Sequence, residues 1–173
     1  KESPFFIYLC HNMTHNPLAA SPAFKGKSQN GLYGDATEEL DWSMGVLLET
    51  LKEEGLDQNT LIIFTSDNGA DEHFGGTNRP LRGQKGTTYE GGFRVPCIMR
   101  WPAKIPAGQE TDNLVTSMDF LPTLAHYCGY AVPSDRVIDG HNVSGILEGE
   151  SMASPTETFY YYQKQQLQAV RWG

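Results

Sequence analysis

The sequence contains no apolar run near the roughly 20 residues that a membrane-spanning helix needs. It also has no excess of positive charge, since 13 lysine and arginine residues stand against 21 aspartate and glutamate residues, for a formal net charge of −8. Such a balance is not typical of proteins that bind nucleic acids or anionic membranes. We therefore expect no nucleic-acid partner and no membrane span, and an anionic substrate would need a few local cations to hold it.

Cysteine is scarce, with only Cys10, Cys97 and Cys128 in the chain. Their spacing fits no metal site and allows at most one disulfide, so we expect free, buried thiols and draw no conclusion about the redox compartment. The chain also opens without an initiating methionine or a signal peptide and runs directly into an apolar segment. We interpret it as an internal piece of a longer protein.

The length of 173 residues and the hydrophobic share of 39% are typical of one globular domain. The best helix is predicted over residues 35–54, where apolar side chains recur at the spacing of one helical stripe. Asp35 with Glu38 resembles a capping box, and Gly55 is a typical helix stop. The stripe consists of Leu40, Met44, Leu47, Leu48 and Leu51.

Two continuous apolar runs, residues 5–10 and 61–65, predict strands buried on both faces of a parallel sheet. A third strand is expected within residues 93–101, and Pro96 indicates that it lies at an edge or starts late. Together with the long helix, these strands indicate an α/β fold. The other predicted elements are a helix from Ser117 or Asp119 to His126, a short helical stretch at 143–147, and a hairpin of 158–163 and 167–172.

The second apolar run ends in Ser66-Asp67-Asn68-Gly69, where a parallel sheet would place a ligand site. A carboxylate beside an amide oxygen suits Ca²⁺ or Mg²⁺, so Asp67 and Asn68 could form half of a metal site. The plainer alternative is an Asx turn, in which both side chains bond their own backbone.

Two further candidates are His15, which follows the first expected strand, and Lys85, which lies in a glycine-rich loop at residues 69–92. A divalent cation, an ammonium group and a histidine in one cleft would suit a tetrahedral oxyanion such as sulfate or phosphate. The cations neutralise charge, and the histidine can protonate a leaving oxygen. Taken singly, each has a plainer interpretation: a loop histidine with a local hydrogen bond, or a solvated lysine.

In order and spacing, these blocks resemble the type I sulfatases, especially the arylsulfatases and the N-acetylgalactosamine-sulfate sulfatases. The similarity covers roughly residues 4–145. The blocks that carry it are Thr65-Ser66-Asp67-Asn68-Gly69, the run Gly75-Gly76-Thr77-Asn78-Arg79-Pro80-Leu81-Arg82-Gly83-Gln84-Lys85-Gly86, Tyr89-Glu90-Gly91-Gly92, His15-Asn16-Pro17, Tyr33-Gly34-Asp35, Trp101-Pro102, Met118-Asp119-Phe120-Leu121-Pro122 and Ile138-Asp139-Gly140.

The resemblance implies part of an alkaline-phosphatase-like, mostly parallel sheet with flanking helices. Residues 1–150 would be the second half of the catalytic domain, and residues 151–173 would begin a small C-terminal antiparallel subdomain. The parent protein would be a sulfuric ester hydrolase acting on a sulfated small molecule or glycan. The family also suggests a secreted, lysosomal or periplasmic location, which the chain itself does not fix.

The resemblance further implies that Asp67 and Asn68 bind Ca²⁺, that Lys85 binds the sulfate group, and that His15 contacts the sulfate ester and assists the leaving oxygen. The family's nucleophile is a formylglycine made from the first residue of a Cys/Ser-x-Pro-x-Arg motif. No such motif occurs in this sequence. We therefore expect the chain alone to be inactive, and to associate with itself or with a missing N-terminal half.

Two other functions are compatible with the same residues. A phosphodiesterase or phosphonate hydrolase of the alkaline-phosphatase-like group would use the same metal chemistry. A truncated, non-catalytic homologue would fold and could bind an anion or a partner.

Overall fold

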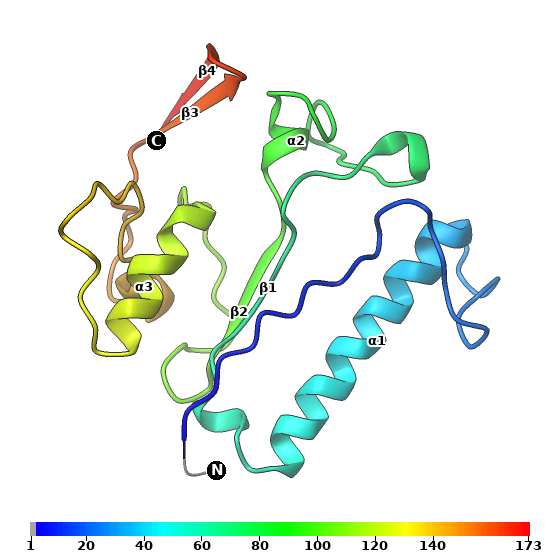
Figure 1. The fold of residues 1–173 in the computed structure, drawn as a ribbon, viewed down its shortest axis with the longest axis horizontal. Helices are drawn as coiled ribbons and strands as arrows, with labels where there is room; N and C mark the ends of the chain where they lie inside the picture. Colours follow the sequence, from blue (N-terminus) through cyan, green and yellow to red (C-terminus); the bar gives the residue numbers. More distant parts are fainter. Residues whose placement is uncertain (1–2) are drawn as a thin grey trace.

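The computed structural model describes residues 3–173, which form a mixture of helices and short strands (Figure 1). The long helix α1 comes first and is followed by two strand pairs and three shorter helices. The elements are α1 (Gly31–Glu53), β1 (Ile62–Thr65), α2 (Glu90–Phe93), β2 (Cys97–Arg100), α3 (Phe120–Tyr127), α4 (Ser144–Leu147), β3 (Thr158–Gln163) and β4 (Gln166–Trp172), with single 3₁₀ turns at Asp57–Asn59, Glu72–Phe74 and Ser117–Asp119.

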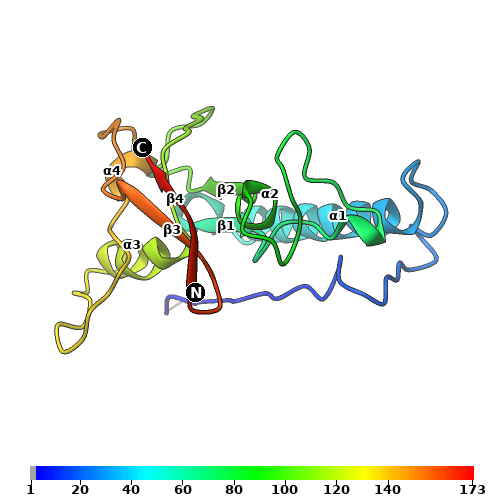
Figure 2. The ribbon, with the colours of Figure 1, turned by 90° about the horizontal axis from the view of Figure 1, so that it is seen from above.

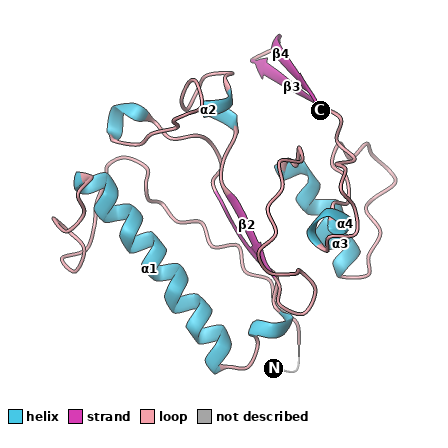
Figure 3. Ribbon diagram, turned by 180° about the vertical axis from the view of Figure 1, so that it is seen from behind, coloured by secondary structure: helices cyan, strands magenta, loops and turns pink. Residues whose placement is uncertain are grey.

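The strands form two separate antiparallel pairs. β1 pairs with β2, with Ile62 opposite Arg100 and Thr65 opposite Cys97. This pair lies between α1 and α3, as the opposite views of Figures 1 and 3 and the view from above in Figure 2 show. β3 and β4 form the predicted C-terminal hairpin. Within residues 3–173, β1 has no parallel neighbour, because its one hydrogen-bonded partner is β2.

The prediction of a buried strand at residues 5–10 is wrong for this chain. The segment is extended and lies to one side of α1 and β1 in the view of Figure 2, but none of the described residues forms a ladder with it. Its side chains are exposed, with Phe6 at 80% and Tyr8 at 82%. The expectation of buried thiols is also wrong, because all three cysteines are free and exposed. A strand-like sequence becomes a buried strand only when neighbouring strands cover it.

The long helix begins four residues earlier than predicted, and Asp35 does not cap it. Its carboxylate instead accepts hydrogen bonds from the backbone N–H groups of Gly26, at 2.7 Å, Ser28, at 2.8 Å, and Lys27, at 3.1 Å. These bonds, with that from Gly26 the largest contribution, lower the pKa of the buried Asp35. Asp35 thus fixes the loop that leads into α1. The predicted stop is confirmed, since Gly55 has a φ of 66°.

Asp119 connects the start of α3 with a later segment of the chain. Its side chain is completely buried and accepts from the Thr116 backbone at 2.7 Å, the Thr116 hydroxyl at 3.2 Å and the His141 backbone at 2.8 Å. The bonds to Thr116 complete a capping box. Asp119 therefore holds the Ile138-Asp139-Gly140 segment against the helix.

We expect Asp119→Ala to lower the free energy of unfolding by about 3 kcal/mol, because it leaves buried donors without an acceptor. Asp41→Ala, at an exposed position on α1, is the matched control and should leave stability nearly unchanged. Urea denaturation of the intact protein measures both. Equal midpoints for the two variants would contradict the role given to Asp119.

Much of the molecule's apolar surface is uncovered. The accessible surface is 12515 Å², whereas a folded monomer of 19.2 kDa is expected to expose about 8,400 Å². Among the described residues, the buried hydrophobic side chains are Ala36, Val143, Ile146 and Tyr161. No helix in the described part of the chain is both long enough and apolar enough to cross a membrane.

Candidate functional site

The Asp67-Asn68 turn follows β1 directly. The hydrogen bonds that fix it do not use the side chains of Asp67 or Asn68. The Ser66 hydroxyl donates to the Asn68 carbonyl at 2.9 Å, and the Thr65 hydroxyl donates to the Pro96 carbonyl at 2.9 Å. Within residues 3–173, no hydrogen bond of the Asp67 or Asn68 side chain to the backbone is found, so this is not an Asx turn. The side-chain oxygens of Asp67 and Asn68 are therefore available for a ligand.

Three glycines bring the turn against α2 and the lysine-bearing loop. The Gly69 N–H donates to the Gly92 carbonyl at 3.1 Å, and the Gly91 N–H donates to the Arg82 carbonyl at 2.8 Å. A Cβ atom on Gly69 would overlap the Gly91 carbonyl oxygen, and one on Gly91 would overlap that of Gly83. These close backbone approaches require glycine.

The backbone of Lys85 lies beside the same turn. Its N–H donates to the Ala70 carbonyl at 3.1 Å, and that carbonyl also accepts from Asn78 Nδ2 at 2.9 Å. Asn78 Oδ1 in turn accepts from the Ala70 N–H at 2.8 Å, so the Asn78 side chain pairs with both backbone groups of Ala70. Lys85 is thereby fixed at the residue that lies two positions beyond Asn68.

Electrostatic effects indicate where the surrounding side chains lie. The pKa of Asp71 is lowered, mainly by hydrogen bonds from the side chain and backbone of His73, and the charge of Lys85 adds to this effect. The pKa of Tyr8 is raised, mainly by Cys10, with a small contribution from the Asp67 carboxylate. Lys85 therefore lies near Asp71, and the end of the extended N-terminal segment lies near Asp67.

His15 is tied to this region through Tyr33. The Thr14 hydroxyl donates to the Tyr33 hydroxyl at 3.1 Å, and a Cβ atom on Gly76 would lie 3.1 Å from the same Tyr33 oxygen. His15 Nδ1 lies 2.9 Å from the Asn16 carbonyl oxygen. Because a carbonyl can only accept, this contact places the hydrogen on Nδ1 and leaves Nε2 available for another partner.

Backbone hydrogen bonds bring Asp67, Asn68 and Lys85 together at the turn that follows β1. The Tyr33 hydroxyl links the His15 loop to the same region. The structure shows no direct contact among the four side chains in the described part of the chain. The pairing of Asn78 with Ala70 has no signal in the sequence, because nothing in a polar loop residue identifies its partner.

The donor chemistry of Asp67 and Asn68 fits Ca²⁺, which prefers oxygen ligands. Their number does not complete a site, because Ca²⁺ takes about six to eight oxygens. Within residues 3–173, no group of three or more His, Cys, Asp or Glu side chains could hold a metal. This chain could thus supply only part of a calcium site.

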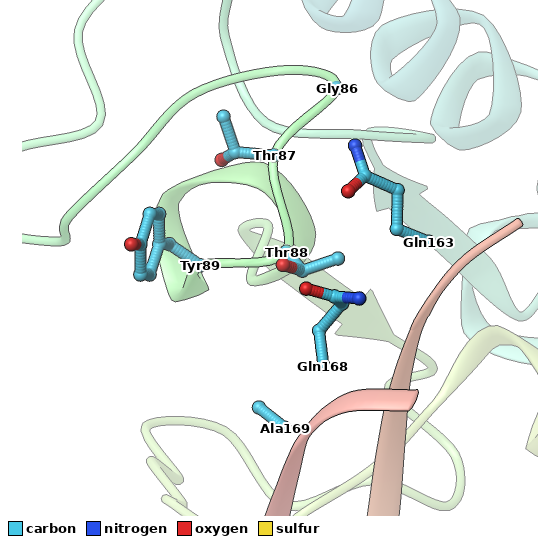
Figure 4. A pocket seen from close by; sticks show the side chains of 7 residues that line it. All are labelled: Gly86, Thr87, Thr88, Tyr89, Gln163, Gln168 and Ala169. Carbon is cyan, nitrogen blue, oxygen red and sulfur yellow. The ribbon is translucent and has the colours of Figure 1, made fainter. Parts of the chain in front are cut away.

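An open hollow of about 370 Å³, with a mixed polar and apolar lining, separates the lysine-bearing loop from the C-terminal hairpin (Figure 4). In Figure 4, Gln163 and Gln168 of the hairpin face Thr87 and Thr88 of the loop. The hairpin thus reaches the part of the chain that follows Lys85.

Comparison with known proteins gives a consistent result. Residues 1–130 match the protein family described as Sulfatase. Steryl-sulfatase from Homo sapiens is 45% identical over 179 residues, covering 99% of this chain and 31% of its own. N-acetylgalactosamine-6-sulfatase from Mus musculus is 43% identical over 178 residues, covering 100% of this chain and 34% of its own.

Solved structures extend the similarity to the fold. The PsFucS1 sulfatase from Pseudoalteromonas sp. has 37% identity and a TM-score of 0.86, covering 92% of this chain and 33% of its own. A phosphonate monoester hydrolase from Agrobacterium radiobacter is more distant, with 28% identity and a TM-score of 0.59, covering 78% of this chain and 26% of its own. These neighbours confirm the expected alkaline-phosphatase-like fold class, although the strand pairs within residues 3–173 are both antiparallel.

The chain spans about a third of the length of the curated relatives it matches. The family match includes His15, the Asp67-Asn68 turn and Lys85, and the curated relatives cover nearly every residue at more than 40% identity. The chain belongs to the sulfatase family.

Proposed function

We propose that this chain is part of a Ca²⁺-dependent enzyme that hydrolyses sulfate monoesters. The observation that carries the proposal is a pair of backbone hydrogen bonds, Gly69 to Gly92 and Lys85 to Ala70. These bonds place the free side-chain oxygens of Asp67 and Asn68 and the lysine at the same turn. Residues 1–150 would form the second half of the catalytic domain, and residues 151–173 would begin the C-terminal subdomain. The formylglycine nucleophile is expected in the N-terminal half of the parent protein.

Each residue of this chain would have a distinct role. Asp67 and Asn68 would supply oxygen ligands to Ca²⁺, which when bound stabilises negative charge on the sulfate group. Lys85 would bind a sulfate oxygen and supply local positive charge in a chain whose net charge is negative. His15, with Nδ1–H directed to the Asn16 carbonyl, would act as the imidazolium, with a second proton on Nε2 that it gives to the leaving oxygen.

The substrate class is a sulfated small molecule or glycan. The names of the relatives, steryl-sulfatase and N-acetylgalactosamine-6-sulfatase, support sulfate esters in general and do not choose between these two kinds. A phosphodiesterase or phosphonate hydrolase is the second candidate, since such a hydrolase shares the fold at lower similarity.

The uncovered surface supports an association partner. The apolar side chains of residues 5–9 are all at least half exposed, and Ile98 on β2 is 64% exposed. Such surfaces are normally covered by another part of the protein. We propose that the N-terminal half of the parent protein covers them, and that the chain alone associates with itself.

The proposed function is tested with the intact parent protein and an aryl sulfate. We expect hydrolysis of nitrophenyl sulfate that a chelator abolishes and added Ca²⁺ restores. A nitrophenyl phosphate diester and a phosphonate monoester should be hydrolysed more slowly, and the 173-residue chain alone should be inactive. Faster hydrolysis of either phosphorus ester would favour the second candidate, and hydrolysis by the chain alone would contradict the proposed division of the site.

A further inference from the structure

The first residue of α2 is held by the C-terminal hairpin. The Tyr161 hydroxyl on β3 donates to Glu90 Oε1, and Arg171 Nη1 on β4 lies 3.3 Å from Glu90 Oε2. Tyr161 is buried, and the side chains of Arg171 and Glu90 are 27% and 34% exposed. Both oxygens of one carboxylate are thus bound by residues that lie 71 and 81 positions away in the sequence.

The last residue of α2 is attached to the same hairpin. The ring of Phe93 packs edge-on against Tyr161, with 5.2 Å between ring centroids, and lies 6.1 Å from Phe159. Such aromatic contacts stabilise a fixed arrangement beyond simple burial. Figure 1 shows the hairpin beside α2, on the side away from α1.

α2 has no other side chains by which it could be held. Its sequence is Glu90-Gly91-Gly92-Phe93, a single helical turn with two buried glycines. A helix this short and this rich in glycine is not stable by itself. Besides the backbone bonds to Gly69 and Arg82, α2 is held within the described part of the chain only by the side chains at its two ends, and both contact the hairpin.

The backbone of α2 is the surface on which the candidate site is assembled. The Gly92 carbonyl receives the N–H of Gly69, which directly follows Asn68, and the Gly91 N–H binds the loop that contains Lys85 through Arg82. A movement of α2 would displace both the metal-ligand turn and the lysine loop.

We propose that Tyr161 and Arg171 are positioning residues, which hold α2 in place through Glu90. Because α2 contacts both segments, these two residues thereby fix the position of the Asp67-Asn68 turn relative to the Lys85 loop. For its effect on hydrolysis this inference rests on the proposed function, whereas its effect on the backbone does not. The C-terminal hairpin would thus contribute to the site without touching the substrate.

The chemistry of the contact suits this role at neutral pH. Burial first, and the hydrogen bond to Glu90 second, raise the pKa of Tyr161 to about 12. The hydroxyl therefore remains a donor at all pH values below about 10. A hydrogen bond to a carboxylate is stronger than one between neutral groups, and Arg171 adds a second charged contact.

The test uses Tyr161→Phe in the intact parent protein, which removes the hydroxyl and keeps the ring. Tyr160→Phe is the matched control, because Tyr160 is the preceding residue on β3 and is exposed. Hydrogen exchange of the Gly69 and Gly91 amides is the main readout. We expect Tyr161→Phe to accelerate their exchange by about tenfold or more, which corresponds to about 1.4 kcal/mol, with no change in the control.

Kinetics and a second substitution complete the design. Tyr161→Phe should lower kcat for an aryl sulfate by about tenfold, leave KM within about twofold, and add no further loss to Glu90→Gln, because both act through one contact. Arg171→Gln, at a partly exposed position, gives the same test if Tyr161→Phe fails to fold.

The outcomes separate the two proposals. Unchanged exchange at Gly69 and Gly91 in both Tyr161→Phe and Arg171→Gln would overturn the positioning role, even in an active sulfatase. Accelerated exchange in a parent protein that does not hydrolyse sulfate esters would support the positioning role and refute the proposed function.

Discussion

Lys85→Ala in the intact protein is expected to lower kcat/KM for an aryl sulfate by about 10²- to 10³-fold, the usual cost of removing one group that stabilises a developing oxyanion. The backbone of Lys85 is fixed to Ala70, so the loss would come from the missing ammonium group and not from a displaced loop. Steady-state kinetics with nitrophenyl sulfate measures the effect.

Lys52→Ala is the control for charge, because Lys52 lies on the exposed side of α1 and its side chain is 70% exposed. It should leave kcat/KM unchanged. Lys85→Arg keeps the charge on a wider and longer side chain and should recover only part of the activity. If Lys85→Ala retains wild-type kinetics, Lys85 has no role in binding sulfate.

Gly69→Ala has the second-largest expected effect. A Cβ atom there would overlap the Gly91 carbonyl oxygen, and a backbone atom cannot swing aside as a side chain does. The turn and α2 must separate, which we expect to cost about 1–3 kcal/mol of stability and to remove Ca²⁺-dependent hydrolysis. Calorimetric unfolding and the sulfatase assay measure the two effects.

Gly45→Ala is a matched glycine control within α1. Apart from its chain neighbours and the backbone of its own helix, no heavy atom lies within 4 Å of the position that a Cβ atom on Gly45 would take, so no packed group opposes the added methyl group. The substitution should stabilise the protein by up to about 1 kcal/mol, because alanine favours the helix. Full activity in Gly69→Ala would show that the close approach to α2 does not position the site.

Sequence patterns predict the local elements of this chain well. The long helix α1, its stop at Gly55 and the C-terminal hairpin all follow from local patterns, and the structure confirms them. The apolar stripe of α1 is only half-buried in this chain. The capping box at Asp35 is wrong because the same spacing also occurs inside a helix, where the carboxylate can bind an earlier loop.

The elements that sequence patterns miss depend on distant partners. Residues 5–10 have the composition of a buried strand but lack a ladder partner among the described residues. The bonds of Glu90 to Tyr161 and Arg171 span 71 and 81 positions, and no periodic pattern in the sequence predicts them. The roles of His15, Asp67, Asn68 and Lys85 come from motif resemblance and stay predictions. The proximity of Asp67, Asn68 and Lys85, in contrast, follows from the backbone hydrogen bonds.

Calcium titration by calorimetry of the intact parent protein tests the central claim, that Asp67 and Asn68 provide part of a Ca²⁺ site. We predict saturable binding by the wild type, binding by Asp67→Ala and Asn68→Ala that is weaker by about tenfold or more, and wild-type binding by the exposed control Asp41→Ala. If Asp67→Ala and Asn68→Ala bind Ca²⁺ as tightly as the wild type does, the assignment of the metal ligands is wrong.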